Sequence, residues 1–344
     1  MIGTKSLMTR EESTAMKGLL MVLIVLCHNA LLNNSLVDGS YLPHRRYIYL
    51  FHVTCFFILP LMYGYTYKYG ENARWRNIGH DTWWNFVRCW VPYTWFFLLF
   101  IVVGIFQHRE FTPSLLAYAY IEGSQSPMAW ILGVHFLWFL PSMCALLVMK
   151  SCWYNAKTWV KVVLVVLGIA LMIQNIWGVF GHIDIWDTIP FSLVQGLKYL
   201  MIALMTRCII EYIDQKLSIM ICCVLLIILT MIFVMDEEKD ILTVLPHFRI
   251  LEWLLPIAIF PLLYYARKLW IKSKLLMLIG RYSLYIYLTH VLVYNVVNFL
   301  LLHLFEKKYL IGTISFVITL GICIGIAYII DKSKWIRMIV FYKQ

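Results

Sequence analysis

The chain has 344 residues and a formal net charge of +11, with 62% hydrophobic, 16% aromatic and only 14% charged residues. Its mean hydropathy of +0.77 excludes an ordinary soluble domain of this length and indicates a polytopic membrane protein. The basic residues are scattered over short loops, so nucleic-acid binding is not expected. The positive charge instead suits the headgroups of anionic membrane lipids, and it would equally suit a phosphorylated substrate in the cytoplasm.

Ten apolar stretches are each long enough to cross a bilayer, which asks for roughly 20 residues per helix. In chain order they are predicted at residues 16–35, 47–67, 85–106, 128–149, 159–179, 189–213, 217–235, 250–270, 283–304 and 310–330. They leave no room for a soluble domain. The sequence therefore predicts an all-α bundle of about ten transmembrane helices, with residues 1–344 forming a single integral-membrane domain.

The lysines and arginines predict the orientation of these helices. The first stretch follows Lys5, Arg10 and Lys17, as in a signal peptide, but no small-residue cleavage site follows it, so we expect it to be retained. With a cytoplasmic N-terminus, 21 of the 29 basic residues lie on the cytoplasmic side and seven lie outside. This bias predicts a multi-pass protein with both termini in the cytoplasm.

The first stretch carries two ionisable residues on one face. In TAMKGLLMVLIVLCHNALLNN (14–34), Lys17 and His28 are 11 residues apart, so a helix places them on the same side and about 16 Å apart along its axis. Lys17 could be an interfacial anchor, and His28 a hydrogen-bonding partner between helices. Ionisable groups inside a membrane segment are costly and usually functional, so a base deep in the bilayer is the alternative.

Three further histidines, His52, His135 and His290, lie within predicted spans. Each alone is more typical of a hydrogen bond between helices than of a catalytic group. No cysteine or histidine spacing matches a metal site, and the nine cysteines suggest no disulfide framework. Neither a metal nor a permanently bound cofactor is expected.

Four sequence motifs follow one another along the chain. They are the Lys-x10-His of the first stretch, YIYLFHVTCFFILPLMYGY (47–65), HFLWFLPSM (135–143) and LIGRYSLYIYLTHVLV (278–293). They resemble the motifs of the membrane-bound acyltransferase 3 family, the O-acyltransferases that modify bacterial cell-envelope and exported polysaccharides. The chain departs from the family pattern at Thr14, where an Asp is usual, and at Pro60 and Leu61, where a Ser-Gly pair is usual.

The resemblance implies transfer of an acyl group, most often acetyl from acetyl-CoA, to a sugar hydroxyl at the bacterial cytoplasmic membrane. His28 is then the expected general base, because neutral imidazole removes a hydroxyl proton well near pH 7. Lys17 and Arg281, at the cytoplasmic rim, are expected to bind the phosphates of acyl-CoA. The motifs that resemble those of the family also suggest oxyanion or positioning roles for a further set of residues, namely Ser283, Tyr287, Trp138, His290 and His52.

A transporter or flippase for a glycan or lipid-linked sugar is the main alternative, because ten spans with buried histidines would also suit a proton-coupled carrier. Against it, the spans contain no midplane Asp or Glu, with Glu211 lying at a helix end. A non-catalytic scaffold in an envelope assembly complex is a third reading. The sequence does not specify the acceptor sugar, the acyl group or the oligomeric state.

Overall fold

A computed structural model describes residues 6–29, 43–62, 75–106, 112–121, 135–155, 157–177, 191–237, 245–304 and 308–341, and the described part contains helices and no strands. The chain divides into two compact units, each considered by itself. One comprises Met1–Ser6, Gly64–Leu204 and Lys334–Gln344, and the other comprises Leu7–Tyr63 and Met205–Ser333. The single integral domain predicted above stays a prediction.

The first unit is built on the long helix α5 (Trp75–Phe106), which packs against α8 (Phe139–Asn155). It also contains α6 (Pro113–Ile121), the 3-10 helix η3 (His135–Trp138), α9 (Thr158–Trp177) and α16 (Lys334–Phe341), and α10 (Phe191–Tyr212) begins in it. The side chain of Tyr120 in α6 packs on Tyr93 and Phe97 of α5. Phe341 of α16 is buried and contacts Phe96 of α5.

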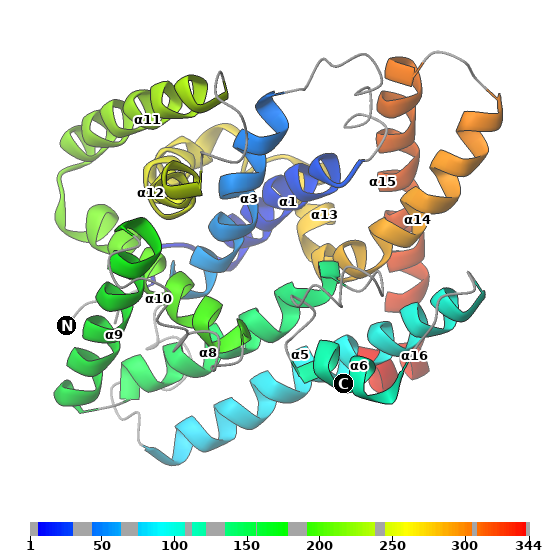
Figure 1. The fold of residues 1–344 in the computed structure, drawn as a ribbon, viewed down its shortest axis with the longest axis horizontal. Coiled ribbons are helices and arrows are strands. Elements are labelled where there is room, and N and C mark those ends of the chain that lie inside the picture. Colours follow the sequence, from blue (N-terminus) through cyan, green and yellow to red (C-terminus); the bar gives the residue numbers. More distant parts are fainter. Residues whose placement is uncertain are drawn as a thin grey trace. The chain divides into compact units, whose positions relative to one another are not determined.

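The second unit surrounds α1 (Arg10–Cys27), which contacts α3 (Pro43–Met62), α13 (Lys274–Arg281), α14 (Ser283–Leu304) and α15 (Lys308–Lys332) (Figure 1). The end of α10, α11 (Gln215–Glu237), α12 (Leu245–Tyr265) and η5 (Ala266–Leu269) complete it. Helix α1 is buried on most of its circumference because neighbours cover several of its faces. Its fully buried side chains include Ala15, Met16, Leu20 and Ile24.

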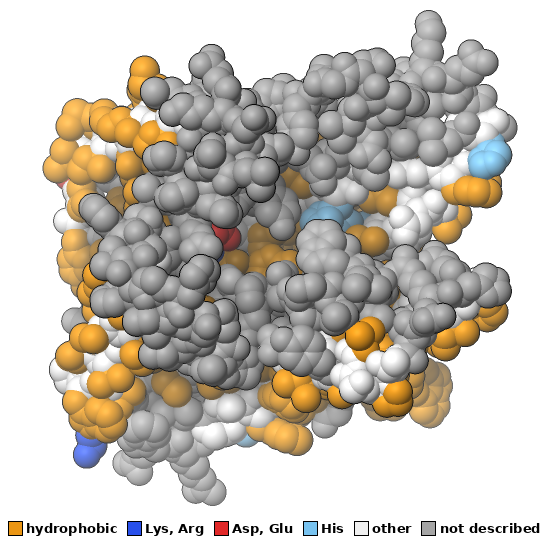
Figure 2. Space-filling view, viewed as in Figure 1, with side chains coloured by type: hydrophobic (Ala, Val, Ile, Leu, Met, Phe, Trp, Pro, Cys, Tyr) orange, Lys and Arg blue, Asp and Glu red, His pale blue; other side chains and the backbone are white. Residues whose placement is uncertain are grey.

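Five helices in the described part are long and apolar enough to cross a membrane: Gly79–Phe106, Ser192–Tyr212, Gln215–Ile232, Ser283–Leu301 and Gly312–Lys332. Side chains such as Ile227 and Val166 are largely exposed on α11 and α9. The described side chains visible in Figure 2 are mostly hydrophobic. Such a surface is costly in water and is favourable against lipid. The protein is therefore a helical membrane protein.

Each of the ten predicted stretches coincides with a helix, although ten spans and cytoplasmic termini stay predictions. The bounds differ at both ends of the first one, which was predicted at residues 16–35 and is helical over Arg10–Cys27. The helix begins earlier because Thr9 and Glu12 cap it, and it ends earlier because the backbone of His28 leaves the helical conformation. The short helices α6, α13 and α16 were not predicted as separate elements.

Candidate active site

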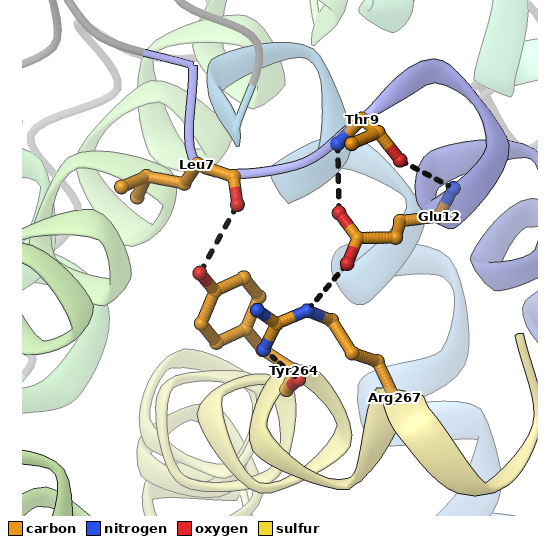
Figure 3. A network of polar contacts seen from close by, with 5 residues as sticks. All are labelled: Leu7, Thr9, Glu12, Tyr264 and Arg267. Carbon is orange, nitrogen blue, oxygen red and sulfur yellow. Dashed lines mark hydrogen bonds and ion pairs between the residues drawn. The ribbon is translucent and has the colours of Figure 1, made fainter.

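The beginning of α1 is fixed by a network of polar contacts (Figure 3). The Thr9 hydroxyl accepts from the Glu12 N–H, and the Glu12 carboxylate accepts from the Thr9 N–H at 2.7 Å. The other carboxylate oxygen of Glu12 accepts from Arg267 Nε at 2.7 Å, and the guanidinium lies 4.1 Å from the centre of the Tyr264 ring. Tyr264 in turn donates its hydroxyl to the Leu7 carbonyl at 3.0 Å. The network ties the start of α1 to the end of α12.

This network determines the charge state of Glu12. Burial alone would raise the pKa of the carboxyl, but the Thr9 N–H and the Arg267 guanidinium outweigh it and lower the pKa below its usual value. Glu12 therefore stays ionised at neutral pH and complements the positive end of the α1 dipole. The pattern Thr9-x-x-Glu12 is readable in the sequence as a capping box, and it is the signal that would have given the correct start of the helix.

His28 occupies the C-terminal cap of α1, with φ −87° and ψ 0°, and is therefore at the end of the helix where the sequence predicted the middle. Its Nδ1 lies 2.8 Å from the Ile24 carbonyl oxygen. A carbonyl can only accept, so Nδ1 carries the proton and the ring nitrogen Nε2 is the basic one in neutral imidazole. A backbone carbonyl thus orients His28, and it sets the tautomer that a general base requires.

The groups next to His28 hold the end of α1 in place. The Asn29 side chain donates to the Gly312 carbonyl of α15 at 2.7 Å, and the Tyr294 hydroxyl of α14 donates to the Val25 carbonyl at 3.0 Å. Val25 is one of the last residues of α1, so its carbonyl lacks a partner within the helix. These two bonds fix His28 against the helices that carry the other site residues. Sequence reasoning missed both, because neither partner is near in the chain.

The structure brings three of the predicted histidines together. The ring of His28 lies 4.9 Å from that of His290 in α14, edge to face at 78°, and 6.5 Å from that of His52 in α3. His52 and His290 are both fully buried. From the sequence, a packing role was favoured over a positioning role for each of these two, and their convergence on His28 is a tertiary feature. The side chain of His135 lies outside the described residues.

His290 is held by two carbonyls of its own helix. Its Nδ1 lies 2.6 Å from the Tyr287 oxygen and 3.2 Å from the Ile286 oxygen, so this nitrogen also carries the proton. The Nε2 of His290 is buried and makes no hydrogen bond to any residue that the structure describes. His28 and His290 therefore share one arrangement, in which Nδ1 donates to the backbone and Nε2 is an acceptor.

Helices α1 and α13, which carry Lys17 and Arg281, meet at two glycines. A Cβ built on Gly18 would lie 2.0 Å from the Leu276 carbonyl oxygen of α13, and one built on Gly280 would lie 1.7 Å from the Thr14 carbonyl oxygen of α1. The two backbones are thus in direct contact beside both cations. Arg281 is mostly exposed and pairs with Asp331 of α15 at 3.2 Å. The contact brings the two predicted phosphate-binding residues to the same region of the second unit.

The remaining candidates separate into two groups. Ser283 and Tyr287 of α14 are buried in the second unit, and the Tyr287 ring lies 5.8 Å from the ring of His290. Trp138 lies in the first unit, where its ring is 6.3 Å from that of Tyr199. Tyr287 thus lies beside the histidines. The oxyanion or positioning roles of Ser283, Tyr287 and Trp138 stay predictions.

A buried arginine supports the helix that carries His52. Arg207 of α10 is fully buried, pairs with Glu211 at 3.1 Å and donates to the Leu61 carbonyl at the end of α3. The Met62 carbonyl accepts from the Leu7 N–H at 2.9 Å. Both carbonyls belong to the last turn of α3 and so have no partner within the helix. Leu61 is one of the two positions where the second motif, residues 47–65, departs from the family pattern. Its carbonyl accepts a hydrogen bond from Arg207 of another helix.

Comparisons with known proteins identify the family of the chain. Searches among curated proteins and among solved structures each returned no match. A family described as an acyltransferase domain, acyltransferase 3, matches residues 11–331, nearly the whole chain. The match includes all of the helices that carry the histidines, Lys17 and Arg281. The chain belongs to the acyltransferase 3 family and is a membrane acyltransferase.

Proposed function

We propose that the protein transfers an acetyl or other short acyl group from cytoplasmic acyl-CoA to a hydroxyl of a cell-envelope or exported sugar or polysaccharide, with His28 as the general base. The observation that carries this proposal is the bond from His28 Nδ1 to the Ile24 carbonyl, which leaves Nε2 as the basic nitrogen. Membership of the family supports acyl transfer as the reaction. The contacts of His28 support its role as the base in that reaction.

In the proposed reaction, His28 Nε2 removes the proton of the acceptor hydroxyl, and the hydroxyl oxygen attacks the thioester carbonyl carbon of acyl-CoA. The tetrahedral intermediate then collapses, the carbon–sulfur bond breaks, and the imidazolium returns the proton to the departing thiolate. Each proton is accounted for, and no further base is required. The developing oxyanion needs a donor, for which the hydroxyls of Tyr287 and Ser283 are the candidates in the second unit.

The donor is expected to enter from the cytoplasmic rim. CoA carries several phosphates at one end and its thioester at the other end of a long, narrow arm. Lys17 and Arg281 would hold the phosphates, while His28 lies about 16 Å further along the axis of α1. This separation lets one molecule of acyl-CoA contact the cations and the base at once.

Purified protein in lipid nanodiscs, incubated with radiolabelled acetyl-CoA, tests the proposal. Slow release of acetate to water, or transfer to an added glycan, is expected and should be lost in His28→Gln. His303→Gln is the matched control, because His303 is exposed at the end of α14 and makes the same bond to a carbonyl four residues earlier, that of Phe299. Full turnover by His28→Gln, or no turnover by the unmodified protein, would contradict the proposal.

A further inference from the structure

The buried acceptor nitrogen of His290 is not used by the reaction proposed above. Its Nδ1 is satisfied by the carbonyls of Tyr287 and Ile286, and its Nε2 receives no hydrogen bond from the described residues. A buried polar atom without a partner loses the hydrogen bond that it makes to water in the unfolded chain, so it destabilises the protein. The side chain is also fully buried, which leaves bulk water unable to satisfy it. The geometry points to a ligand that donates a hydrogen bond to this atom.

The position of His290 narrows the kind of ligand. Its ring lies 4.9 Å from that of His28, and each ring offers an unprotonated Nε2 because each Nδ1 donates to the backbone. In the proposed reaction His28 Nε2 contacts the acceptor hydroxyl, so a ligand that also satisfies His290 Nε2 must present a second donor close to that hydroxyl. Two cations of this kind would repel one another, so a pair of neutral acceptors is the favourable state. Burial at His290 disfavours a charged donor, because taking a charge out of water is costly. Hydroxyl groups are the neutral donors that a sugar supplies.

We propose that His290 is a substrate-binding residue that accepts a hydrogen bond from the hydroxyl adjacent to the one that is acylated. The inference rests on the proposed function, because His28 is taken to bind the reacting hydroxyl. His28 and His290 together then recognise a vicinal diol, the unit that sugars and polyols contain and simple alcohols lack. The second hydroxyl fixes the rotation of the acceptor about its carbon–carbon bond and so aims the first hydroxyl at the thioester.

Two isomeric acceptors test this recognition. Propane-1,2-diol carries neighbouring hydroxyls, whereas propane-1,3-diol has the same atoms and two primary hydroxyls that are separated. Without recognition the 1,3-isomer is the better acceptor on statistical grounds. The purified full chain in nanodiscs would be given radiolabelled acetyl-CoA and each diol at high concentration, and the acetylated diol and free acetate would be separated and counted. One hydrogen bond to a buried acceptor predicts a preference of about tenfold in kcat/KM for the 1,2-isomer.

Variants of His290 distinguish a hydrogen bond to the substrate from a role in packing. His290→Phe keeps an aromatic ring of similar size and removes the acceptor, so the preference for the 1,2-isomer should fall to about one. His290→Gln places an amide oxygen near the position of Nε2 and should retain part of the preference. If His290→Phe fails to fold, His290→Leu provides the same comparison with a smaller side chain. Thermal melting of each variant checks that the fold is intact.

The outcomes distinguish this inference from the proposed function. Equal transfer to both diols by the unmodified protein would overturn the inference, as would an unchanged preference in His290→Phe. Acetate release with no transfer to either diol would also overturn it. In each of these cases acetyl-CoA turnover that depends on His28 would leave the proposed function standing. No turnover of acetyl-CoA, or turnover that persists in His28→Gln, would contradict both the proposed function and this inference.

Discussion

Gly280 of α13 lies against the backbone of Thr14 in α1, so close that a Cβ at this position would come within 1.7 Å of the Thr14 carbonyl oxygen. Gly18 makes the reciprocal contact with Leu276. Small residues allow membrane helices to approach at backbone distance, and here they do so between the two elements that carry Lys17 and Arg281.

Gly280→Ala and Gly18→Ala are therefore expected to destabilise the protein. The atoms that an added methyl group would meet belong to the backbone and cannot rotate away, so the helices must separate, at a cost typical of overpacking, about 1–3 kcal/mol. Thermal melting in nanodiscs measures the effect. Gly321→Ala in α15 is the matched control, because a Cβ there meets nothing within 4 Å and should be neutral or slightly stabilising. Equal melting temperatures for Gly280→Ala and Gly321→Ala would contradict the close packing.

Acid should weaken the start of α1 through Glu12. Its pKa is lowered in the folded protein, so its contribution is complete above the ordinary carboxyl value near 4.5 and is lost as the pH falls through the lowered value. Glu12→Gln should cost about 1 kcal/mol at pH 7 and should flatten the fall in melting temperature between pH 6 and pH 3. Glu11→Gln, at the exposed neighbouring position, is the control and should follow the unmodified protein.

Removal of the imidazole at position 28 should affect the chemical step more than donor binding. His28→Ala is expected to fold, to bind CoA and to lose acyl transfer by roughly 10²- to 10⁴-fold, as is typical of a general base. Rapid-quench measurement of a single turnover reports the chemical step, and equilibrium binding of CoA reports the donor site. A His28→Ala enzyme with near-normal turnover would exclude the proposed mechanism. His52→Ala should cost less activity or should also lower stability.

Binding of CoA should raise the melting temperature, because the ligand binds the folded state selectively. Lys17→Ala and Arg281→Ala should reduce this shift, and salt should weaken it, because exposed charges are screened. Arg281 pairs with Asp331, so Asp331→Asn should increase the shift by releasing the guanidinium for a phosphate. Lys216→Ala, which removes an exposed lysine at the start of α11, should leave the shift unchanged. A full shift in both Lys17→Ala and Arg281→Ala at low salt would place the donor elsewhere.

The orientation in the membrane is testable with single cysteines in a cysteine-free background. Lys272→Cys, between η5 and α13, is expected to be cytoplasmic and protected from an impermeant thiol reagent in intact cells. Asp184→Cys, which falls outside the described residues, is expected to react from the outside. Labelling of both positions from the same side would contradict the ten-helix topology.

The helices could be predicted from the sequence because membrane helices are long apolar runs whose signal is local. The end of α1 at His28 could not, because the apolar run continues beyond it and the bonds of Asn29 and Tyr294 that hold this end come from contacts with α15 and α14. The candidate base was identified by its spacing from Lys17. Its neighbours His52 and His290 lie within predicted spans too, but spacing within one helix says nothing about which helices meet. The role of Glu12 likewise required Arg267, which lies 255 residues away.

Helix α1 is synthesised before the other described helices, yet the groups that hold its two ends are made much later. Arg267 and Tyr264 at its start are 255 and 257 residues from their partners, and Tyr294 at its end is 269 residues from Val25. Contacts of such long range form late, after the intervening chain has been inserted. During biosynthesis α1 is therefore in the bilayer before the partners of its two ends exist, and a chain that stops before Tyr264 contains His28 but lacks the contacts of Tyr264, Arg267 and Tyr294.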